Sequence, residues 1–167
     1  IMPKISVIMP TYNSSSEYLR LAIESVINQV YQNWELCIAD DASTLGATKE
    51  IILAYAELDS RIKICFRENN GHISCASNDA VSLASGDYIA LLDHDDELHP
   101  LALHYVVMAI NEKPHIDLIY TDEDKIDAFG RRIDPYFKSD WNYYLFLSQN
   151  MISHLGVYRS SLVREVG

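Results

Sequence analysis

Short apolar runs alternate with stretches of helical periodicity along most of this chain, and this alternation restricts the fold more than any other feature. Five runs have the length of buried strands, at residues 5–9, 36–39, 62–66, 88–92 and 117–120. The segments between them place apolar residues three and four positions apart, which is typical of amphipathic helices. Strands separated by helices predict an α/β fold with right-handed crossovers and a mostly parallel sheet flanked by helices.

Each expected helix is defined by the apolar face that it would bury. These faces consist of Leu19, Ala22, Ile23, Val26, Ile27 and Val30; Ile51, Ile52, Tyr55 and Leu58; Ile73, Ala76, Ala80, Leu83 and Ala84; and Leu98, Leu101, Ala102, Tyr105, Met108 and Ala109. After Lys125 the rhythm changes, and we expect a small hairpin around Phe129 and Gly130, a strand within 152–158 and a helix starting at 160–166. A length of 167 residues without a repeat or linker predicts one domain.

The charge balance limits the kinds of partner. The formal net charge is -11, which argues against a nucleic-acid surface, because such a surface carries a basic stripe. An acidic chain that binds an anionic ligand needs a metal ion or backbone amides at its site. Cys37, Cys65 and Cys75 are expected to be small buried side chains rather than disulfide or zinc partners, which favours a reducing compartment. No apolar stretch approaches the roughly 18 residues of a membrane-spanning helix.

A dense acidic stretch follows the fourth predicted strand, with four carboxylates between Asp93 and Glu97. In open α/β sheets, ligands bind beyond the carboxyl ends of the strands. Like charges packed together are unfavourable unless a positive group neutralises them, and Asp93 and Asp95 have the spacing to present two oxygens to a divalent cation. The alternative is a solvated acidic loop, and Asp96 and Glu97 suit the N-terminus of the next helix.

Polar clusters follow all five predicted strands, at residues 10–13, 40–41, 69–72, 93–96 and 122–124. One such cluster means little, because turns need asparagine, aspartate, glycine and proline. Since parallel strands end at a common edge, five clusters predict a polar binding site there.

Several common sites are excluded by their missing motifs. The chain has no G-x-G-x-x-G after the first strand, no P-loop and no G-x-S-x-G. An EF-hand is excluded because Leu98 stands where that loop needs glycine and His104 where it needs glutamate. A phosphotransferase of the haloacid-dehalogenase type carries its aspartate pair after the first strand, whereas this pair follows the fourth. What remains is a metal-dependent site for a diphosphate ligand.

Four segments in this order resemble the inverting glycosyltransferases of family 2, which have the GT-A fold: VIMPTYN at 7–13, ADDAS at 39–43, NNGHISCASN at 69–78 and LLDHDDELHP at 91–100. The resemblance is specific over residues 4–125 and extends less specifically to HLGVYR, as in bacterial members that build surface polysaccharides. It implies a single GT-A domain over 1–167, with a donor-binding part at 1–125 and a partial acceptor-side region at 126–167.

The resemblance implies roles for the first three motifs. The nucleotide-base pocket would be lined by Pro10, Thr11, Tyr12 and Asn13. Asp40 or Asp41 would accept the N3–H of uracil or thymine, while the alternative role is a turn cap, expected for Asp41 or its neighbour Ser43. Asn70, Gly71 and Asn78 would lie beside the ribose and diphosphate, at the positive end of a helix beginning at Ser74. For Asn78, a polar helix face is an equal alternative.

In the fourth motif, Asp93 would approach the ribose or sugar, and Asp95 would bind Mg²⁺ or Mn²⁺ together with Asp93. His94 would touch the donor sugar or point outward. The implied reaction moves a sugar from a UDP- or TDP-type donor to a hydroxyl of a glycan or lipid-linked acceptor, with inversion. We expect the family's catalytic base beyond Gly167, after a Gly-Gly-Phe-like segment, so no base is assigned, and we expect these residues alone to bind the donor but transfer poorly.

The remaining candidates have competing roles. Asp122, Glu123 and Asp124 would line the acceptor or sugar side, and His154 is expected to be structural. The aromatic residues Trp141, Tyr143 and Tyr144 would stack on a sugar, pack in the core or form a lid. A non-catalytic sugar-nucleotide-binding or polysaccharide-binding module is the alternative function. We expect a cytoplasmic protein, with peripheral membrane association through parts outside this chain.

Overall fold

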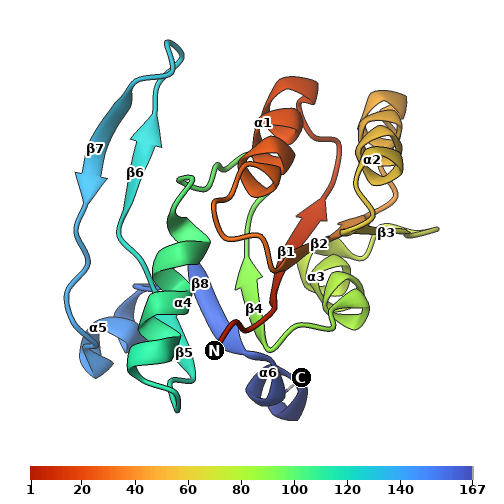
Figure 1. The fold of residues 1–167 in the computed structure, drawn as a ribbon. Coiled ribbons are helices and arrows are strands. Elements are labelled where there is room, and N and C mark those ends of the chain that lie inside the picture. Colours follow the sequence, from red (N-terminus) through yellow and green to blue (C-terminus); the bar gives the residue numbers. More distant parts are fainter. Residues whose placement is uncertain (167) are drawn as a thin grey trace.

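A computed structural model describes residues 1–166 as one main sheet with helices on both faces and a separate hairpin (Figure 1). The main sheet has six strands in the order β3-β2-β1-β4-β8-β5. Its strands are β1 (Ile5–Thr11), β2 (Trp34–Asp40), β3 (Ile62–Phe66), β4 (Tyr88–Leu91), β5 (Leu118–Tyr120) and β8 (Gly156–Arg159). Only β8 runs antiparallel, between β4 and β5, so the predicted mostly parallel α/β sheet is confirmed.

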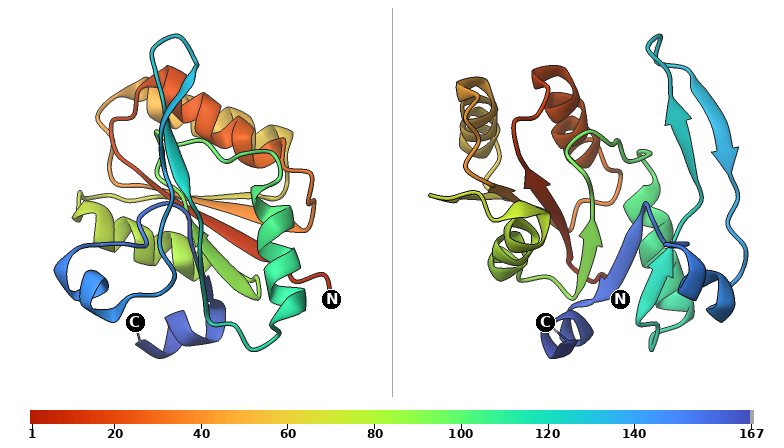
Figure 2. Two further views of the ribbon diagram at one scale, coloured as in Figure 1. Left: turned by 90° about the vertical axis from the view of Figure 1, so that its left-hand side faces the viewer. Right: turned by 180° about the vertical axis from the view of Figure 1, so that it is seen from behind.

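The helices form a layer on each face of the sheet (Figure 2). They are α1 (Ser16–Ile27), α2 (Gly46–Leu58), α3 (His72–Leu83), α4 (Ala102–Glu112), α5 (Tyr143–Ser148) and α6 (Ser160–Val166). The larger core cluster joins the sheet to α1, α2 and α4, whereas the smaller one joins its other face to α3 and α6. None of the described helices has both the length and the apolarity needed to cross a membrane.

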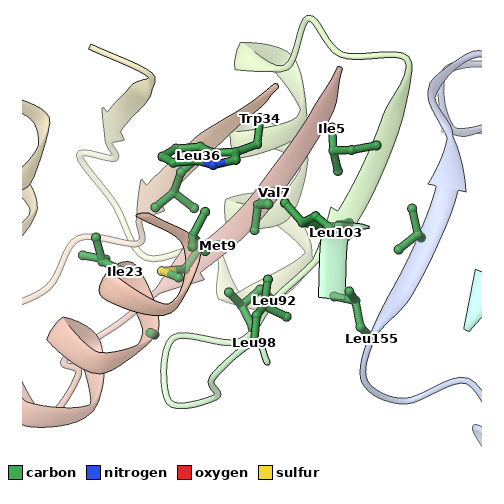
Figure 3. Close-up of a cluster of buried hydrophobic side chains, with 14 of the residues drawn as sticks. Ile5, Val7, Met9, Ile23, Trp34, Leu36, Leu92, Leu98, Leu103 and Leu155 are labelled. Atoms are coloured by element: carbon green, nitrogen blue, oxygen red, sulfur yellow. The ribbon is translucent and has the colours of Figure 1, made fainter. Parts of the chain in front are cut away.

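The central strands alternate their side chains between the two core clusters. Ile5, Val7 and Met9 of β1 lie beside Trp34 and Leu36 of β2 on the α1 face (Figure 3). Successive residues of a strand point to opposite faces. Ile8 and Cys37 accordingly pack against α3. Both faces are apolar because both are covered, as is typical of parallel sheets.

The fourth predicted helix was wrong in both its start and its buried face. Helix α4 begins at Ala102, and Leu103 and Val106 are buried while Tyr105 and Met108 are exposed. Pro100 disfavours helical backbone in the residue before it, which delays the start. The buried side chain of Gln29 caps the N-terminus of α4, because its Oε1 accepts a hydrogen bond from the Leu103 amide. Asp96 and Glu97 therefore do not lie in the first turn of α4, contrary to the expectation.

Other expected buried side chains are also exposed. They are Val30, Leu58, Ile73 and Cys75. Val30 lies beyond the end of α1, and Leu58 is the last residue of α2, so neither faces the sheet. Only Cys37 is fully buried among the three cysteines, while Cys65 is partly buried.

The predicted hairpin is confirmed as β6 (Glu123–Ile126) and β7 (Arg132–Tyr136), which extend away from the main sheet (Figures 1 and 2). Gly130 has a φ of 74°, a conformation that glycine adopts without strain at such a turn. The predicted strand within 152–158 is β8, and the predicted last helix is α6.

A buried glutamate ties together the amino ends of the central strands. Glu35 lies at the start of β2 with its side chain 1% exposed, and its carboxylate contacts Lys4 Nζ at 2.5 Å and Lys63 Nζ at 2.8 Å. It also accepts hydrogen bonds from Ser6 Oγ at 2.7 Å and from the Ser85 amide. Burial raises the pKa of Glu35, but these lysines and hydrogen bonds outweigh burial and hold the pKa well below its ordinary value.

Replacing Glu35 by glutamine should lower the free energy of unfolding at pH 7 by about 2 kcal/mol, because charge-assisted hydrogen bonds are lost from a buried site. The folded-state pKa is depressed, so the contribution of Glu35 is present above the unfolded-state value of about 4.3 and is lost as the pH falls below it. Urea denaturation should therefore show a difference in the free energy of unfolding between the parent and Glu35→Gln at pH 7, and this difference should become smaller toward pH 3. The exposed Glu50→Gln is the control, and an equal loss in that variant would contradict this role.

Candidate functional site

The loops after the parallel strands meet at one edge of the sheet, as predicted. Strands β3, β2, β1 and β4 are mutually parallel, and β5 shares their direction because both β4 and β5 pair antiparallel with β8. Hydrogen bonds continue past the strand ends: the Asp41 amide donates to the Thr11 carbonyl at 2.8 Å, and the Arg67 amide donates to the Asp40 carbonyl at 2.9 Å. The polar loops are therefore fixed directly to the sheet.

Asp40 is fully buried and caps the turn after β2. Its Oδ2 accepts a hydrogen bond from the Ser43 amide at 3.0 Å, while Oδ1 has no partner within residues 1–166. The turn cap was expected to be Asp41 or Ser43, and this assignment was wrong. The reason is the two-residue period of β2, which turns Asp40 toward the helical layer of α1 and α2 and Asp41 to the opposite face.

Asp41 holds the loop that follows β3. Its Oδ1 accepts a hydrogen bond from the Gly71 amide at 2.9 Å and lies 2.9 Å from Arg67 Nε. Asn70 Nδ2 donates to the Asp41 carbonyl at 3.2 Å, and Arg67 also pairs with Asp79 on α3. Asp41, Asn70 and Gly71, which the sequence placed together, form one hydrogen-bonded unit.

Gly71 is required by close packing at this point. A Cβ there would lie 2.7 Å from Arg67 Nη2 and 2.9 Å from Cys75 Cβ. Helix α3 begins directly after it, at His72 rather than at Ser74. The His72 amide donates to Asn70 Oδ1 at 3.3 Å, so this amide and that of Gly71 are already engaged within the chain. Asn78 is exposed on α3.

The residues at the end of β1 and just after it divide between structural and exposed positions. Thr11 is buried, and its Oγ1 donates to the Ala39 carbonyl at 3.3 Å. The Asn13 side-chain oxygen accepts hydrogen bonds from the amides of Thr44 and Leu45 at 2.9 and 3.1 Å, which fixes the loop before α2. Pro10 is partly buried, and Tyr12 is 46% exposed beside these positions.

The acidic loop after β4 lies against His154, which the sequence assigned to structure. Strand β8 pairs Gly156 with Leu91, and this register continued by two residues brings His154 opposite Asp93. His154 Nε2 lies 3.8 Å from Asp93 Oδ2, and His154 Nδ1 lies 3.3 Å from Asp96 Oδ2. Asp95 and Glu97 are exposed on the same loop, and His94 is partly buried.

Asp93, Asp96 and His154 form a group that fits a divalent cation. Each offers one ligand atom, and these atoms lie within 4.8 Å of one another. Burial raises the pKa of Asp96, and the nearby carboxylates of Asp93, Asp95 and Glu123 raise it further against the opposing effect of His154. Oxygen donors suit Mg²⁺ and Mn²⁺, and an imidazole nitrogen favours a transition metal such as Mn²⁺ over Mg²⁺.

An ion pair between buried Lys138 and partly exposed Glu123 holds the backbone of His154. Glu123 Oε2 accepts a hydrogen bond from the His154 amide at 3.1 Å, and Lys138 Nζ donates to the His154 carbonyl at 2.6 Å. Lys138 Nζ also lies 2.9 Å from Glu123 Oε2 and donates to the Ile152 carbonyl at 2.6 Å. The Lys138 side chain is only 2% exposed. Burial raises the pKa of Glu123, but Lys138 and the His154 amide outweigh burial and lower it.

The other acids of this region are engaged within the chain. Asp122 Oδ1 accepts a hydrogen bond from the Lys138 amide at 2.8 Å, and Asp124 pairs with Arg132 at 2.5 Å. The expected aromatic residues are exposed, so they are not core: Trp141, Tyr143 and Tyr144. Trp141 also borders an apolar cavity of about 550 Å³ lined by Leu118, Phe146, Asn150, Ile152, Tyr158 and Leu162.

Sequence reasoning missed His154 and Lys138 as members of the site region, and it assigned Asp96 to the next helix instead of the group with Asp93 and His154. The signal was the placement of His154 just before a short apolar strand, but its significance depends on the antiparallel insertion of β8, which motif spacing does not reveal. Lys138 had no local signal, because its partners lie about 15 residues away on either side along the chain.

The profile described as Glycosyl transferase family 2 matches residues 6–167. The chain is 53% identical over 165 residues to the y4gI protein of Sinorhizobium fredii and 37% identical over 165 residues to the O-antigen biosynthesis protein RfbC of Myxococcus xanthus. Both alignments cover 99% of this chain, but only 18% and 13% of those proteins. The chain therefore spans less than a fifth of the length of these relatives.

Two solved structures are similar in fold. One is S. aureus TarS in complex with UDP-GlcNAc, with a TM-score of 0.79 and 25% identity, covering 98% of this chain and 47% of that one. The other is the mannosyltransferase PcManGT from Pyrobaculum calidifontis in complex with GDP-Man and Mn²⁺, with a TM-score of 0.74 and 18% identity, covering 100% of this chain and 47% of that one. Because the profile match extends over residues 6–167 and the fold agrees with both neighbours, the chain belongs to glycosyl transferase family 2 and has the GT-A fold.

Proposed function

We propose that the chain forms the donor-binding part of an inverting glycosyltransferase. It takes a sugar from a UDP- or TDP-type donor and passes it to a hydroxyl of a glycan or lipid-linked acceptor, in the biosynthesis of a polysaccharide. Family membership supports glycosyl transfer, and the name of the O-antigen biosynthesis protein RfbC supports a polysaccharide product. We propose a cytoplasmic location, because the three cysteines are free and suit a reducing compartment. Association with the inner face of the membrane would involve parts outside this chain.

The observation that carries this proposal is the meeting of two polar groups at the carboxyl edge of the sheet. One is Asp41 with the Arg67–Gly71 loop, and the other is the acidic loop with His154. The first group suits a nucleoside, because it offers a carboxylate in a rigid, mostly buried frame. The second suits a diphosphate, because it can hold the cation that neutralises one.

Asp41 rather than Asp40 is our candidate for the nucleotide base. Both side chains are buried, but Asp40 caps its own turn on the side of the α1 and α2 layer, whereas Asp41 faces the side of the sheet on which Gly71 and Asn70 lie. A carboxylate that Arg67 keeps in place accepts the N3–H of uracil or thymine, and cytosine lacks that proton. Thr11 and Tyr12 would lie beside the base, and Asn13 would keep their loop in shape.

The diphosphate requires positive charge that this part of the chain supplies poorly. The amides of Gly71 and His72 are engaged, and the chain carries a net charge of -11. We therefore propose Mg²⁺ or Mn²⁺ held by Asp93 together with Asp95, and the fold neighbour PcManGT was solved with Mn²⁺. When bound, such an ion stabilises the charge that develops on the leaving diphosphate. His94 would lie toward the donor sugar, and Asn78 toward the ribose.

Titration of UDP, TDP and GDP with and without Mn²⁺ tests the proposal. We expect UDP and TDP to bind more tightly than GDP, and Mn²⁺ to strengthen UDP binding at least tenfold. Asp93→Asn and Asp95→Ala should each remove most of that gain, because they take away a charged ligand. Glu97→Gln, an exposed acid on the same loop, is the control. If nucleotide affinity is the same with and without Mn²⁺ and in both variants, the chain is instead a non-catalytic binding module.

Asp41→Asn tests the recognition of the base. An amide can donate to the N3 acceptor of cytosine, which a carboxylate cannot do, so we expect UDP affinity to fall about tenfold and CDP affinity to rise relative to it. Calorimetric titration with UDP and with CDP measures the ratio of the two affinities. Asp79→Asn is the matched control, because Asp79 shares Arg67 with Asp41 but lies on α3. The same change of ratio in the control would assign the effect to Arg67 instead of the base contact.

A further inference from the structure

We infer that His154 supplies a ligand to the metal site from the acceptor-side region, and that the ion pair of buried Lys138 with Glu123 positions it. The ion would lie between Asp93 and His154 Nε2. The carboxylate of Asp96 would accept a hydrogen bond from the Nδ1–H group on the other side of the ring. This inference rests on the proposed function, because it assigns further residues to the same metal-dependent site.

The geometry of the three side chains fits this arrangement. Asp93 Oδ2 and His154 Nε2 are 3.8 Å apart, which is compatible with two donors that each lie about 2.1 Å from one ion. On the other side of the ring, Nδ1 lies 3.3 Å from Asp96 Oδ2. Metal-bound histidines commonly donate their second ring N–H to a carboxylate, which fixes the tautomer and the ring orientation. Asp96 is thereby a positioning residue.

The backbone on both sides of His154 is unusually well fixed. Its amide donates to Glu123 and its carbonyl accepts from Lys138, and the next amide, that of Leu155, donates to Thr121 Oγ1 at 3.1 Å. The antiparallel pairing of β8 with β4 then carries this segment to Asp93. The imidazole is therefore held at the acidic loop by contacts that do not involve the loop itself.

The burial of Lys138 indicates a positioning role more than a stabilising one. A buried ion pair contributes little net stability compared with apolar residues of similar size, because removing both charges from water is costly. Lys138 has only 2% of its side chain exposed, and its ammonium contacts three acceptors from two segments: Glu123 and the carbonyls of Ile152 and His154. A fully satisfied polar network of this kind specifies one backbone arrangement, here that of the His154 segment.

Mn²⁺ binding in the presence of UDP tests the ligand assignment. Free Mn²⁺ is counted by its EPR signal, and pulsed EPR detects a coordinated imidazole nitrogen. We expect the parent to show the nitrogen signal, and His154→Ala to lose it together with a 10- to 100-fold loss of Mn²⁺ affinity. His104→Ala, which removes an exposed histidine on α4, is the matched control and should change neither.

The positioning pair is tested with the double variant Lys138→Met/Glu123→Gln, which leaves no unpaired buried charge and keeps His154. We expect about a tenfold loss of Mn²⁺ affinity and a weakened nitrogen signal. If the pair is purely structural, the double substitution should lower the unfolding temperature but leave both the Mn²⁺ affinity and the nitrogen signal unchanged. That result would overturn the positioning role. If the double variant does not fold, Glu123→Gln alone, which removes the negative charge that pairs with Lys138, is measured in the same way.

The outcomes separate this inference from the proposal on which it rests. A parent that binds no Mn²⁺ with UDP overturns both. A parent that binds Mn²⁺ without a nitrogen signal, or with an affinity that His154→Ala leaves unchanged, overturns the His154 ligand alone and leaves the metal-dependent donor site standing.

Discussion

The antiparallel pairing of β8 with β4 is the contact on which the rest of the site depends. Residues 121–155 leave the sheet and form the exposed hairpin and α5, and the chain then returns as β8 between β4 and β5. Because the pairing of Leu91 with Gly156 fixes the register, the residues just before β8 must lie beside those just after β4. A shift by one residue would turn the alternate side chains to the other face and remove His154 from Asp93.

Charge is handled differently at the two ends of the sheet. At the amino end, Glu35 is surrounded by Lys4 and Lys63, so the site is neutralised within the chain and serves stability. At the carboxyl end, Asp93 to Glu97 have only His154 nearby as a basic group among the ion pairs of the described residues. The same sheet thus has a charge network closed within the chain at its amino end, and an acidic loop that a cation would neutralise at the end where the donor is expected.

The fold and the edge of the sheet at which the polar loops gather were largely predictable, and the individual contacts were not. Apolar runs such as 5–9 and 88–92 identified the parallel strands, because burial on both faces leaves a continuous apolar pattern that local reading detects. The turn cap was assigned to Asp41 or Ser43 instead of Asp40, since two adjacent acids at a strand end differ only in the face to which they point. The α4 face was misread because that segment is apolar nearly all round, so periodicity alone does not select one side.

The sequence by itself determined the α/β class, the family and the edge of the sheet at which polar residues collect, because these follow from local periodicity and from motifs contiguous in the chain. The tertiary structure alone decided that His154 faces Asp93 and Asp96, and that Lys138 and Glu123 hold it there. Those contacts join residues more than 10 positions apart through a strand inserted against the prevailing direction of the sheet. Their cause is the register of a long-range ladder, which no short stretch of sequence encodes.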